Sequence, residues 1–326
     1  MRWLLAAAVV CSLACGGDDE DPADAGATMD SETLSDAFVP FDGAPADAAS
    51  SDAAVTGDAG ATDAGTLPLE IGGERPAKVV VPSSYDPATP TPLLVLLHGY
   101  SASGSVQDLY FGMSRNTRMR GMLLLIPDGT VDANGNRFWN ATDACCDFGG
   151  IGPDDVSYLR GLIAEMKSFY NVDADRVYLV GHSNGGFMSY RMACDASEEI
   201  TAIVSLAGST FLDESRCNPT RPVSVLQIHG TADSSVAYEG RPFAYPSARG
   251  TVQRFAMRAG CTATERTAPI DFDRSLPGDE TQVERWTGCD EGLAAELWTI
   301  EGGGHIPALS PAATSDILDW LLARSF

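Results

Sequence analysis

The chain has 326 residues, of which 44% are hydrophobic, and its 45 Asp and Glu outnumber its 21 Lys and Arg to give a net charge of −24. Such an excess of negative charge argues against a nucleic-acid partner. The composition changes sharply near residue 66, so the N-terminal part and the remainder differ in kind.

The first residues have the features of a secretory signal. An apolar stretch, residues 3–10, is far shorter than the roughly 20 residues that a membrane-spanning helix needs. Residues 12–15 (Ser-Leu-Ala-Cys) approximate a lipoprotein cleavage motif, although Ser12 stands where that motif usually has Leu. We predict a signal peptide over residues 1–15 and lipidation of Cys15, with ordinary cleavage nearby as the alternative. The protein would then be exported and would touch a membrane only through its lipid.

Residues 16–66 are mainly Asp, Ala, Gly, Ser and Thr, with few large apolar side chains. Such a segment cannot bury enough apolar surface to offset the loss of chain entropy on folding, so we predict a disordered tether. It contains 13 acidic residues and neither Lys nor Arg. The acidity of the chain therefore belongs mainly to the tether and says little about an active site.

Residues 67–326 are long enough for one large α/β domain. Short apolar runs in this part are typical of buried strands. They cover residues 78–81, 93–97, 122–126, 177–180, 202–206, 223–228 and 296–300. Helical patterns separate them. Alternation of strands and helices predicts a mostly parallel sheet with helices on both faces and a site at the carboxyl ends of the strands.

The clearest helical pattern begins after Pro153, where Asp154 or Asp155 can cap the first turn. Its apolar stripe consists of Val156, Leu159, Ile163, Met166 and Tyr170. This spacing predicts an amphipathic helix that packs against the sheet.

Residues 181–185 (Gly-His-Ser-Asn-Gly) follow the apolar run 176–180 and match the G-x-S-x-G pattern. The pattern alone is weak, because small residues often flank serine by chance. Here, however, the two glycines permit a sharp turn that exposes the Ser183 hydroxyl, and residues 186–192 read as a helix whose N-terminus favours an anion. This setting predicts a nucleophilic serine.

Partners for the serine follow other predicted strands. His305, in a glycine-rich loop after the last strand, is the predicted base, and Asp233 is the predicted acid that orients it, with Asp213 as the alternative. The order Ser, Asp, His is that of an α/β-hydrolase triad. His98 and His229 each precede a glycine at a strand end, where histidine more often holds loops together than abstracts a proton.

Attack by a serine hydroxyl on a carbonyl carbon leaves negative charge on the carbonyl oxygen, so the site also needs hydrogen-bond donors for this oxyanion. The backbone N–H groups of Tyr100 and Asn184 are the predicted donors. Trp139 either forms an aromatic wall for the substrate or packs a loop, and His182 lies beside the serine as a packing or pocket residue. We expect no cofactor and no metal, since no cysteine pair has zinc-finger spacing with a nearby histidine.

Eight cysteines are present, and the six beyond the signal segment suggest disulfides formed in an oxidising compartment. Six cysteines allow 15 connectivities. Proximity along the predicted fold favours Cys194 with Cys217 and Cys261 with Cys289. The adjacent Cys145 and Cys146 would then form a vicinal bridge or remain thiols.

Together these segments resemble the polyhydroxybutyrate depolymerase and feruloyl esterase group of secreted carbohydrate esterases. The resemblance covers most of residues 78–310. It rests on residues 96–99 (LLHG), 145–146 (CC), 154–156 (DDV), 175–178 (DRVY), 181–186 (GHSNGG), 229–233 (HGTAD), 259–261 (AGC) and 301–305 (EGGGH). It implies an α/β-hydrolase fold, metal-free ester hydrolysis and the same triad.

The chain departs from this group just after the predicted base. Members often have a Trp-Pro-Gly run there, whereas this chain reads Ile-Pro-Ala-Leu at residues 306–309. An aryl-ester or polymer-binding surface therefore cannot be inferred from that run.

The sequence thus predicts an exported serine carboxylic-ester hydrolase. Its substrates would be feruloyl or acetyl esters of polysaccharide, or polymeric hydroxyalkanoates. A serine peptidase on the same fold is one alternative, because the triad does not distinguish acyl leaving groups. A surface binding module without turnover is another, which the loss of a triad residue would favour; no such loss is present.

Overall fold

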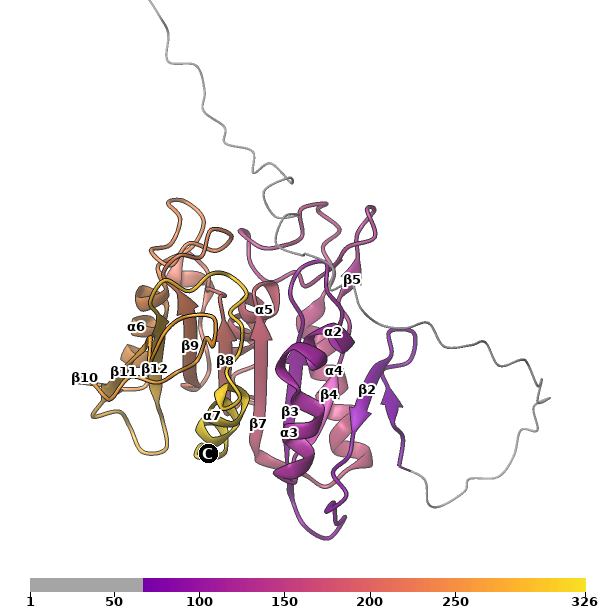
Figure 1. The fold of residues 1–326 in the computed structure, drawn as a ribbon. Helices are drawn as coiled ribbons and strands as arrows, with labels where there is room; N and C mark the ends of the chain where they lie inside the picture. Colours follow the sequence, from indigo (N-terminus) through magenta and orange to yellow (C-terminus); the bar gives the residue numbers. More distant parts are fainter. Residues whose placement is uncertain (1–66) are drawn as a thin grey trace, which may run out of the picture. The chain divides into compact units, whose positions relative to one another are not determined.

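The apolar runs of the sequence lie side by side in a ten-stranded sheet (Figure 1). The computed structural model describes residues 67–326, so the predicted signal peptide (1–15) and tether (16–66) lie outside the described residues. The strand order is β1-β2-β4-β3-β7-β8-β9-β12-β11-β10. The strands are Glu70–Ile71 (β1), Ala77–Val80 (β2), Thr91–Leu97 (β3), Leu123–Ile126 (β4), Val172–His182 (β7), Ala202–Leu206 (β8), Ser224–Gly230 (β9), Ala263–Arg266 (β10), Thr281–Thr287 (β11) and Ala295–Ile300 (β12).

The centre of the sheet is parallel and its edges are antiparallel. Strands β4, β3, β7, β8, β9 and β12 pair in parallel. Strands β1 and β2 on one side, and β10 and β11 on the other, run antiparallel to their neighbours. The predicted mostly parallel sheet is confirmed, and each of the seven predicted apolar runs forms a strand.

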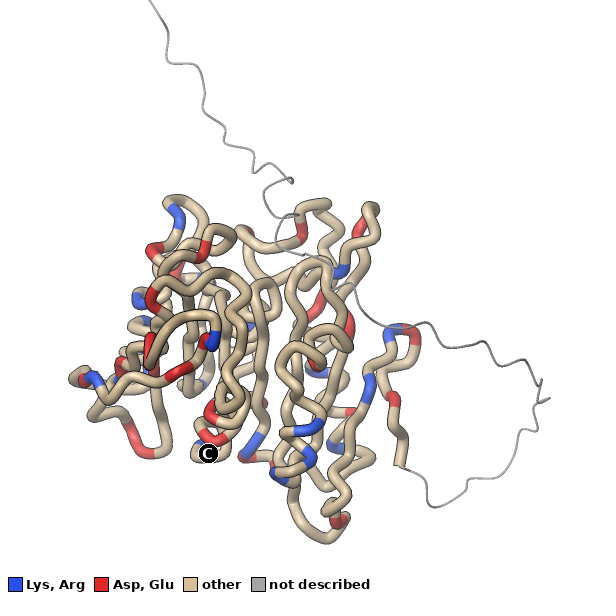
Figure 2. The backbone as a smooth tube through the Cα atoms, viewed as in Figure 1, with Lys and Arg blue, Asp and Glu red and all other residues tan. Residues whose placement is uncertain are grey.

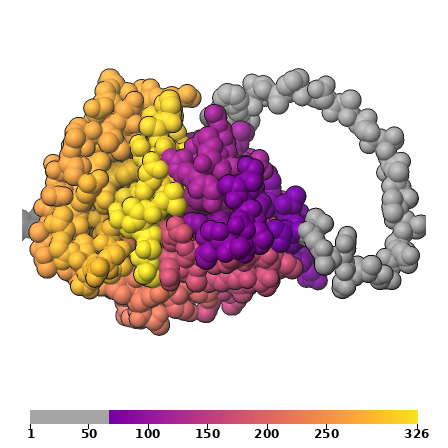
Figure 3. Space-filling view, turned by 90° about the horizontal axis from the view of Figure 1, so that it is seen from below, coloured from indigo at the N-terminus to yellow at the C-terminus, as the bar shows by residue number. Residues whose placement is uncertain are grey.

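Helices cover both faces of the sheet. Helices α4 (Asp155–Phe169), α5 (Asn184–Asp195) and α6 (Ala248–Arg258) bury their apolar side chains against one face. Helices α2 (Gly104–Phe111), α3 (Met113–Met119) and α7 (Ala313–Leu322) cover the other face. A 3-10 turn, Glu214–Arg216, follows β8. Seen from below, the C-terminal segment (yellow) lies beside the N-terminal part of the domain, where α7 contacts α3 (Figure 3).

The predicted amphipathic helix is α4. Asp154 caps it, and its carboxylate accepts a hydrogen bond of 3.0 Å from the N–H of Ser157. The stripe faces the core, since Leu159, Ile163 and Met166 are buried. Periodicity sufficed here because a single face of the helix meets the sheet.

The strands that the sequence analysis missed are short or polar. Strand β11 alternates buried Thr281 and Val283 with more exposed polar residues, so it contains no continuous apolar run. All four residues of β10 are exposed at the edge of the sheet. The other missed strands have two residues each. They are β1 and the two strands of a separate hairpin, β5 (Thr130–Val131) and β6 (Arg137–Phe138). A search for apolar runs finds only strands that are buried on both faces.

Acidic and basic residues are interspersed along the backbone of the described domain (Figure 2). Among residues 67–326, the structure has no helix both long enough and apolar enough to span a membrane.

Three disulfides join the six cysteines of the domain. The two favoured pairs, Cys194–Cys217 and Cys261–Cys289, are both present. The first ties the end of α5 to the segment after the 3-10 turn, and the second ties the segments on either side of the β10–β11 hairpin. The adjacent Cys145 and Cys146 are bridged to each other.

Replacing Cys194 and Cys217 together by Ala should lower the free energy of unfolding by roughly 3 kcal/mol, because the bridge restricts the unfolded chain. The two cysteines are 23 residues apart, a loop length for which this effect is substantial. Urea unfolding monitored by tryptophan fluorescence measures the change. The surface variant Ser168→Ala is the control, and an unchanged midpoint in the double variant would contradict the expectation.

Candidate active site

Ser183 occupies a sharp turn between β7 and α5. Its backbone has φ 54° and ψ −119°, a left-handed conformation that is strained for a residue with a side chain. The N–H of Ser183 donates a hydrogen bond of 2.8 Å to the carbonyl of Leu206 on the neighbouring strand β8. The side chain makes no capping hydrogen bond to α5, so the hydroxyl is free to meet another partner.

Close backbone contacts explain both glycines of the G-x-S-x-G pattern. A Cβ atom on Gly181 would overlap the carbonyl oxygen of Gly185, and one on Gly185 would overlap the carbonyl oxygen of Leu97 at the end of β3. The turn therefore closes only with glycine at these two positions. The same packing brings the end of β3 against the serine.

A chain of two hydrogen bonds joins Ser183 to His305 and Asp233. Nε2 of His305 is 2.9 Å from Oγ of Ser183, and Nδ1 of His305 is 2.8 Å from Oδ2 of Asp233. An ionised carboxylate only accepts hydrogen bonds, so Nδ1 of His305 carries the proton and Nε2 accepts from the serine hydroxyl. The structure thus brings together the three residues that the sequence analysis selected from separate loops.

The carboxylate of Asp233 is fully buried but well supplied with donors. Its Oδ1 atom accepts hydrogen bonds from the N–H groups of Ser235 (2.9 Å) and Val236 (2.8 Å). Burial alone would raise the pKa of Asp233, but hydrogen bonds from His229 and His305 outweigh it and hold that pKa well below its usual range. Asp233 is therefore ionised at neutral pH and can stabilise a charged imidazole. The alternative acid, Asp213, instead caps the 3-10 turn.

His229 supports Asp233 from the side away from His305. Gln227 donates from Nε2 to the carbonyl of Gly208 (2.9 Å) and to Nδ1 of His229 (3.0 Å). Nδ1 is therefore the acceptor, and Nε2–H of His229 points at the Val236 carbonyl (2.8 Å) and at Oδ2 of Asp233 (3.3 Å). The sequence analysis predicted that His229 holds a loop, but it did not find this contact with the acid.

The two remaining histidines hold backbone segments beside the serine. Nε2 of His182 donates to the carbonyl of His305 (2.9 Å), and its ring packs against that of His305 with centroids 5.1 Å apart. Nδ1 of His98 donates to the Gly99 carbonyl, and its Nε2 accepts from the N–H of Gly129, both at 2.8 Å. His182 therefore packs against the predicted base, beside the serine.

The predicted oxyanion donors lie next to Ser183. A Cβ atom on Gly99 would be 3.5 Å from Cβ of Ser183, so the segment from Gly99 to Tyr100 lies against the serine. Among the described residues, the N–H of Tyr100 has no hydrogen-bond acceptor. Asn184 is the first residue of α5, where a backbone N–H has no acceptor within the helix. Both groups are thus available to an incoming oxygen.

The interpretation of Trp139 as an aromatic wall is wrong. Its side chain is fully buried, and its indole N–H donates to the carbonyl of His98 (3.1 Å). The Asn184 side chain bonds both the N–H (2.7 Å) and the carbonyl (2.9 Å) of Trp139. Trp139 therefore fixes the loop beside the serine and cannot face a ligand.

A different aromatic pair is exposed near the predicted oxyanion donors. The rings of Tyr100 and Phe148 meet edge to face with centroids 5.3 Å apart, and Phe148 is 47% exposed. The Tyr100 hydroxyl donates to Asp132 (2.9 Å), which orients the ring. The Cys145–Cys146 bridge precedes Phe148 in the segment between β6 and α4, and the side-chain amide of Asn184 lies 3.5 Å from Sγ of Cys145. No sequence pattern had linked Phe148 to the site.

Within residues 67–326, no group of three or more His, Cys, Asp or Glu side chains is arranged to hold a metal ion.

Known proteins resemble this chain in sequence. A family model described as phospholipase/carboxylesterase matches residues 77–258. Feruloyl esterase B of Piromyces equi is 29% identical over 241 residues, which are 70% of this chain and 42% of that protein. The putative esterase NocK of Nocardia uniformis subsp. tsuyamanensis is 28% identical over 236 residues, 67% of each chain.

The bifunctional acetylxylan esterase/xylanase XynS20E of Neocallimastix patriciarum is 26% identical over 252 residues, 77% of this chain and 34% of that protein. The chain thus spans less than half the length of two of these three relatives. In structure, it is similar to the acetyl xylan esterase from Aspergillus awamori, with TM-score 0.54 and 16% identity over 78% of this chain and 98% of that one. At this identity the likeness shows the fold alone.

Buried histidines should make the protein less stable below neutral pH. Burial lowers the pKa of His98 to about 4 and that of His182 to about 3, against 6.5 in the unfolded chain. Between pH 6.5 and 4 the unfolded chain binds protons that the folded one does not, so stability is greatest above pH 6.5 and falls as the pH falls. Urea unfolding at pH 5 should give a free energy lower than at pH 7 by about 1 to 2 kcal/mol per histidine.

The variant His98→Gln removes one of the two titrating groups and should lose part of this pH dependence. Equal unfolding free energies at pH 5 and pH 7 in the unmodified protein would contradict the expectation.

Proposed function

Since the chain belongs to the phospholipase/carboxylesterase family, we propose that it is a serine carboxylic-ester hydrolase whose catalytic residues are Ser183, His305 and Asp233. The observation that carries this proposal is the hydrogen-bonded chain from the Ser183 hydroxyl through His305 to an ionised, buried Asp233. This arrangement supplies a nucleophile, a general base and an orienting anion in one line.

The proposed reaction begins when Oγ of Ser183 attacks the ester carbonyl carbon while Nε2 of His305 takes the hydroxyl proton. Asp233 stabilises the resulting imidazolium. The backbone N–H groups of Tyr100 and Asn184 bind the oxyanion, and one such donor contributes roughly 3 to 4 kcal/mol in related hydrolases. His305 then gives its proton to the leaving alcohol. Water repeats the sequence on the acyl-enzyme and releases the acid.

The proposed substrates are feruloyl or acetyl esters of polysaccharide, or polymeric hydroxyalkanoates. The names of the relatives, a feruloyl esterase and an acetylxylan esterase, support the first two classes. The exposed Phe148 beside Tyr100 offers an aromatic surface next to the oxyanion donors, in the role first considered for Trp139. An aromatic acyl group could stack there, so this pair supports the feruloyl class.

We further propose that the enzyme is exported and that residues 67–326 are its catalytic domain. Three disulfides in this domain support an oxidising compartment, since cytosolic proteins seldom keep such bridges. The signal peptide over residues 1–15, the lipid on Cys15 and the tether over residues 16–66 remain proposals from the sequence.

Ser183→Ala and His305→Ala should each remove nearly all ester hydrolysis, and the double variant should be little slower than either single one, because the residues act as a unit. A fluorophosphonate should label Ser183 alone, which peptide mass mapping checks. Ser168→Ala is the control for the serine change. Near-normal turnover by His305→Ala would contradict the proposed triad.

A rate panel on the purified protein tests the substrate class. Methyl ferulate, acetylated xylan, hydroxybutyrate oligomers and peptide anilides represent the four candidates. We expect hydrolysis of one or more of the esters and none of the anilides. Cleavage of the anilides with no action on the esters would favour the peptidase alternative.

His229 should act as a positioning residue. His229→Phe removes the donor to Oδ2 of Asp233, and loss of a hydrogen bond to a carboxylate should lower kcat about tenfold with KM nearly unchanged. His229→Gln restores an N–H donor and should recover part of the rate. A rise in KM with kcat unchanged would show instead that His229 serves substrate binding.

A further inference from the structure

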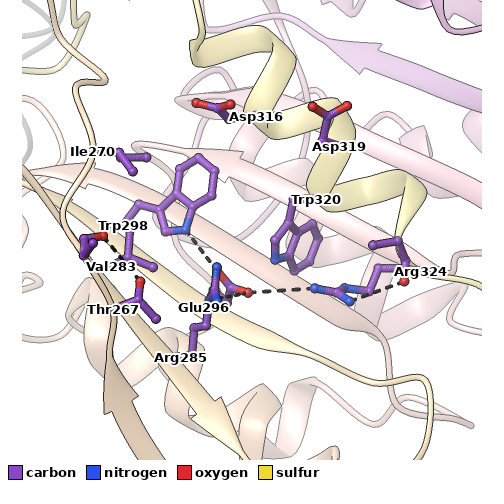
Figure 4. A pocket seen from close by; sticks show the side chains of 12 residues that line it. Thr267, Ile270, Val283, Arg285, Glu296, Trp298, Asp316, Asp319, Trp320 and Arg324 are labelled. Carbon is purple, nitrogen blue, oxygen red and sulfur yellow. Dashed lines mark hydrogen bonds and ion pairs between the residues drawn. The ribbon is translucent and has the colours of Figure 1, made fainter.

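A second concave site lies away from Ser183, on the face of the sheet that carries α7. It is a groove of about 670 Å³ between α7, strands β11 and β12, and the segment around Ile270. Figure 4 shows the indole rings of Trp298 from β12 and Trp320 from α7 on either side of this space. Its volume is within the range of sites that hold small ligands. None of the proposed catalytic or oxyanion-binding residues lines it.

The groove contains buried hydrogen-bond donors that lack partners. Trp320 is only 6% exposed, and its indole N–H has no acceptor among residues 67–326. Nε of Arg324 is likewise unpaired within the described part of the chain. By contrast, the indole N–H of Trp298 donates to Oε2 of Glu296 at 3.1 Å. Buried donors without acceptors destabilise a fold, so a ligand that supplies acceptors would bind here favourably.

The charges around the groove compensate one another. Oε1 of Glu296 is 3.2 Å from Nε of Arg285 and 3.8 Å from Nη2 of Arg324. Asp319 pairs with Arg120 at 2.9 Å. A third carboxylate, Asp316, points toward the other end of the groove (Figure 4). An anion would meet these carboxylates, and a cation would meet the guanidinium groups, so neither charge is favoured.

These features describe the ligand. It must be neutral, and it must carry oxygen acceptors for Trp320 and hydroxyl donors for the carboxylates. Its apolar C–H groups need to meet only the small exposed parts of the two indole rings, since Trp298 and Trp320 are 5% and 6% exposed. A sugar ring combines all of these properties. We propose that the groove is an accessory binding site for a neutral saccharide unit of a polysaccharide. This proposal rests on the proposed ester hydrolysis in one respect, because the groove would hold the polymer that bears the ester.

An accessory site of this kind acts through effective concentration. Binding one part of a polymer to the groove keeps its other parts near Ser183 without any new contact at the reacting ester. The groove should therefore matter for polymeric substrates and should not affect small esters. This difference separates a saccharide site from a purely structural crevice.

The binding test uses the full chain with Ser183→Ala, so that no turnover occurs. Isothermal titration calorimetry with unsubstituted xylohexaose, and with cellohexaose as a second neutral oligosaccharide, measures affinity directly. We expect saturable binding of at least one of them and a loss of tenfold or more in affinity on adding Trp320→Phe, which keeps a ring but removes the N–H donor. Trp286→Phe is the matched control, because Trp286 lies on β11 outside the groove, and it should leave the affinity unchanged.

A kinetic test uses the chain with Ser183 intact. Trp320→Phe should leave kcat/KM for a small soluble acetyl ester unchanged and lower it severalfold for acetylated xylan.

Absence of saccharide binding, or binding that Trp320→Phe does not weaken, would overturn the accessory site even if the protein hydrolyses esters. An equal loss of rate on both substrates would overturn it too. Failure of the proposed function would look different, since all esters would then resist hydrolysis while the Ser183→Ala chain could still bind the oligosaccharide.

Discussion

The site depends on the close approach between the turn at Ser183 and the end of β3. Gly185 lies so near the Leu97 carbonyl that no side chain fits between them. This contact places the helix N-terminus of α5 and the segment from Gly99 to Tyr100 on two sides of one serine. This arrangement requires a strained backbone at Ser183, and the hydrogen bond from its N–H to Leu206 on the neighbouring strand β8 helps to maintain it.

All four histidines of the chain gather around this turn, and each has a different task. His98 and His182 are neutral ties between backbone segments, and their burial keeps them uncharged near neutral pH. His229 donates to Asp233, and His305 links that carboxylate to Ser183. Histidine thus joins backbone segments at two positions, supports a carboxylate at a third and is the proposed base at the fourth, according to what faces its two nitrogens.

The loop that carries His305 is held by residues on the face of the sheet that α2 covers, which is opposite to the face that α5 covers. The Tyr110 hydroxyl on α2 donates to the carbonyl of Pro307 at 2.7 Å, and the buried Asp273 accepts from the N–H of Ala308 at 3.1 Å. The N–H of Ser310 donates to the carbonyl of Phe272 at 2.8 Å. The same chain segment then leads into α7, which forms one wall of the groove. The loop that carries His305 and the groove beside Trp320 are therefore connected through one continuous chain segment, although they lie at different places on the domain.

The sequence by itself determined the mostly parallel sheet and the helix at α4, because buried runs and helical periodicity are local signals. Strand-end motifs likewise selected Ser183, Asp233 and His305, whose side chains the structure places in one hydrogen-bonded chain. The sequence could not decide between a packing and a ligand-facing Trp139, since burial depends on the loop that covers it. Nor could it find Phe148 beside Tyr100, the support of Asp233 by His229, or the groove between Trp298 and Trp320. These features join residues from segments that meet only when the chain folds, and no local pattern records how far apart such side chains finally lie.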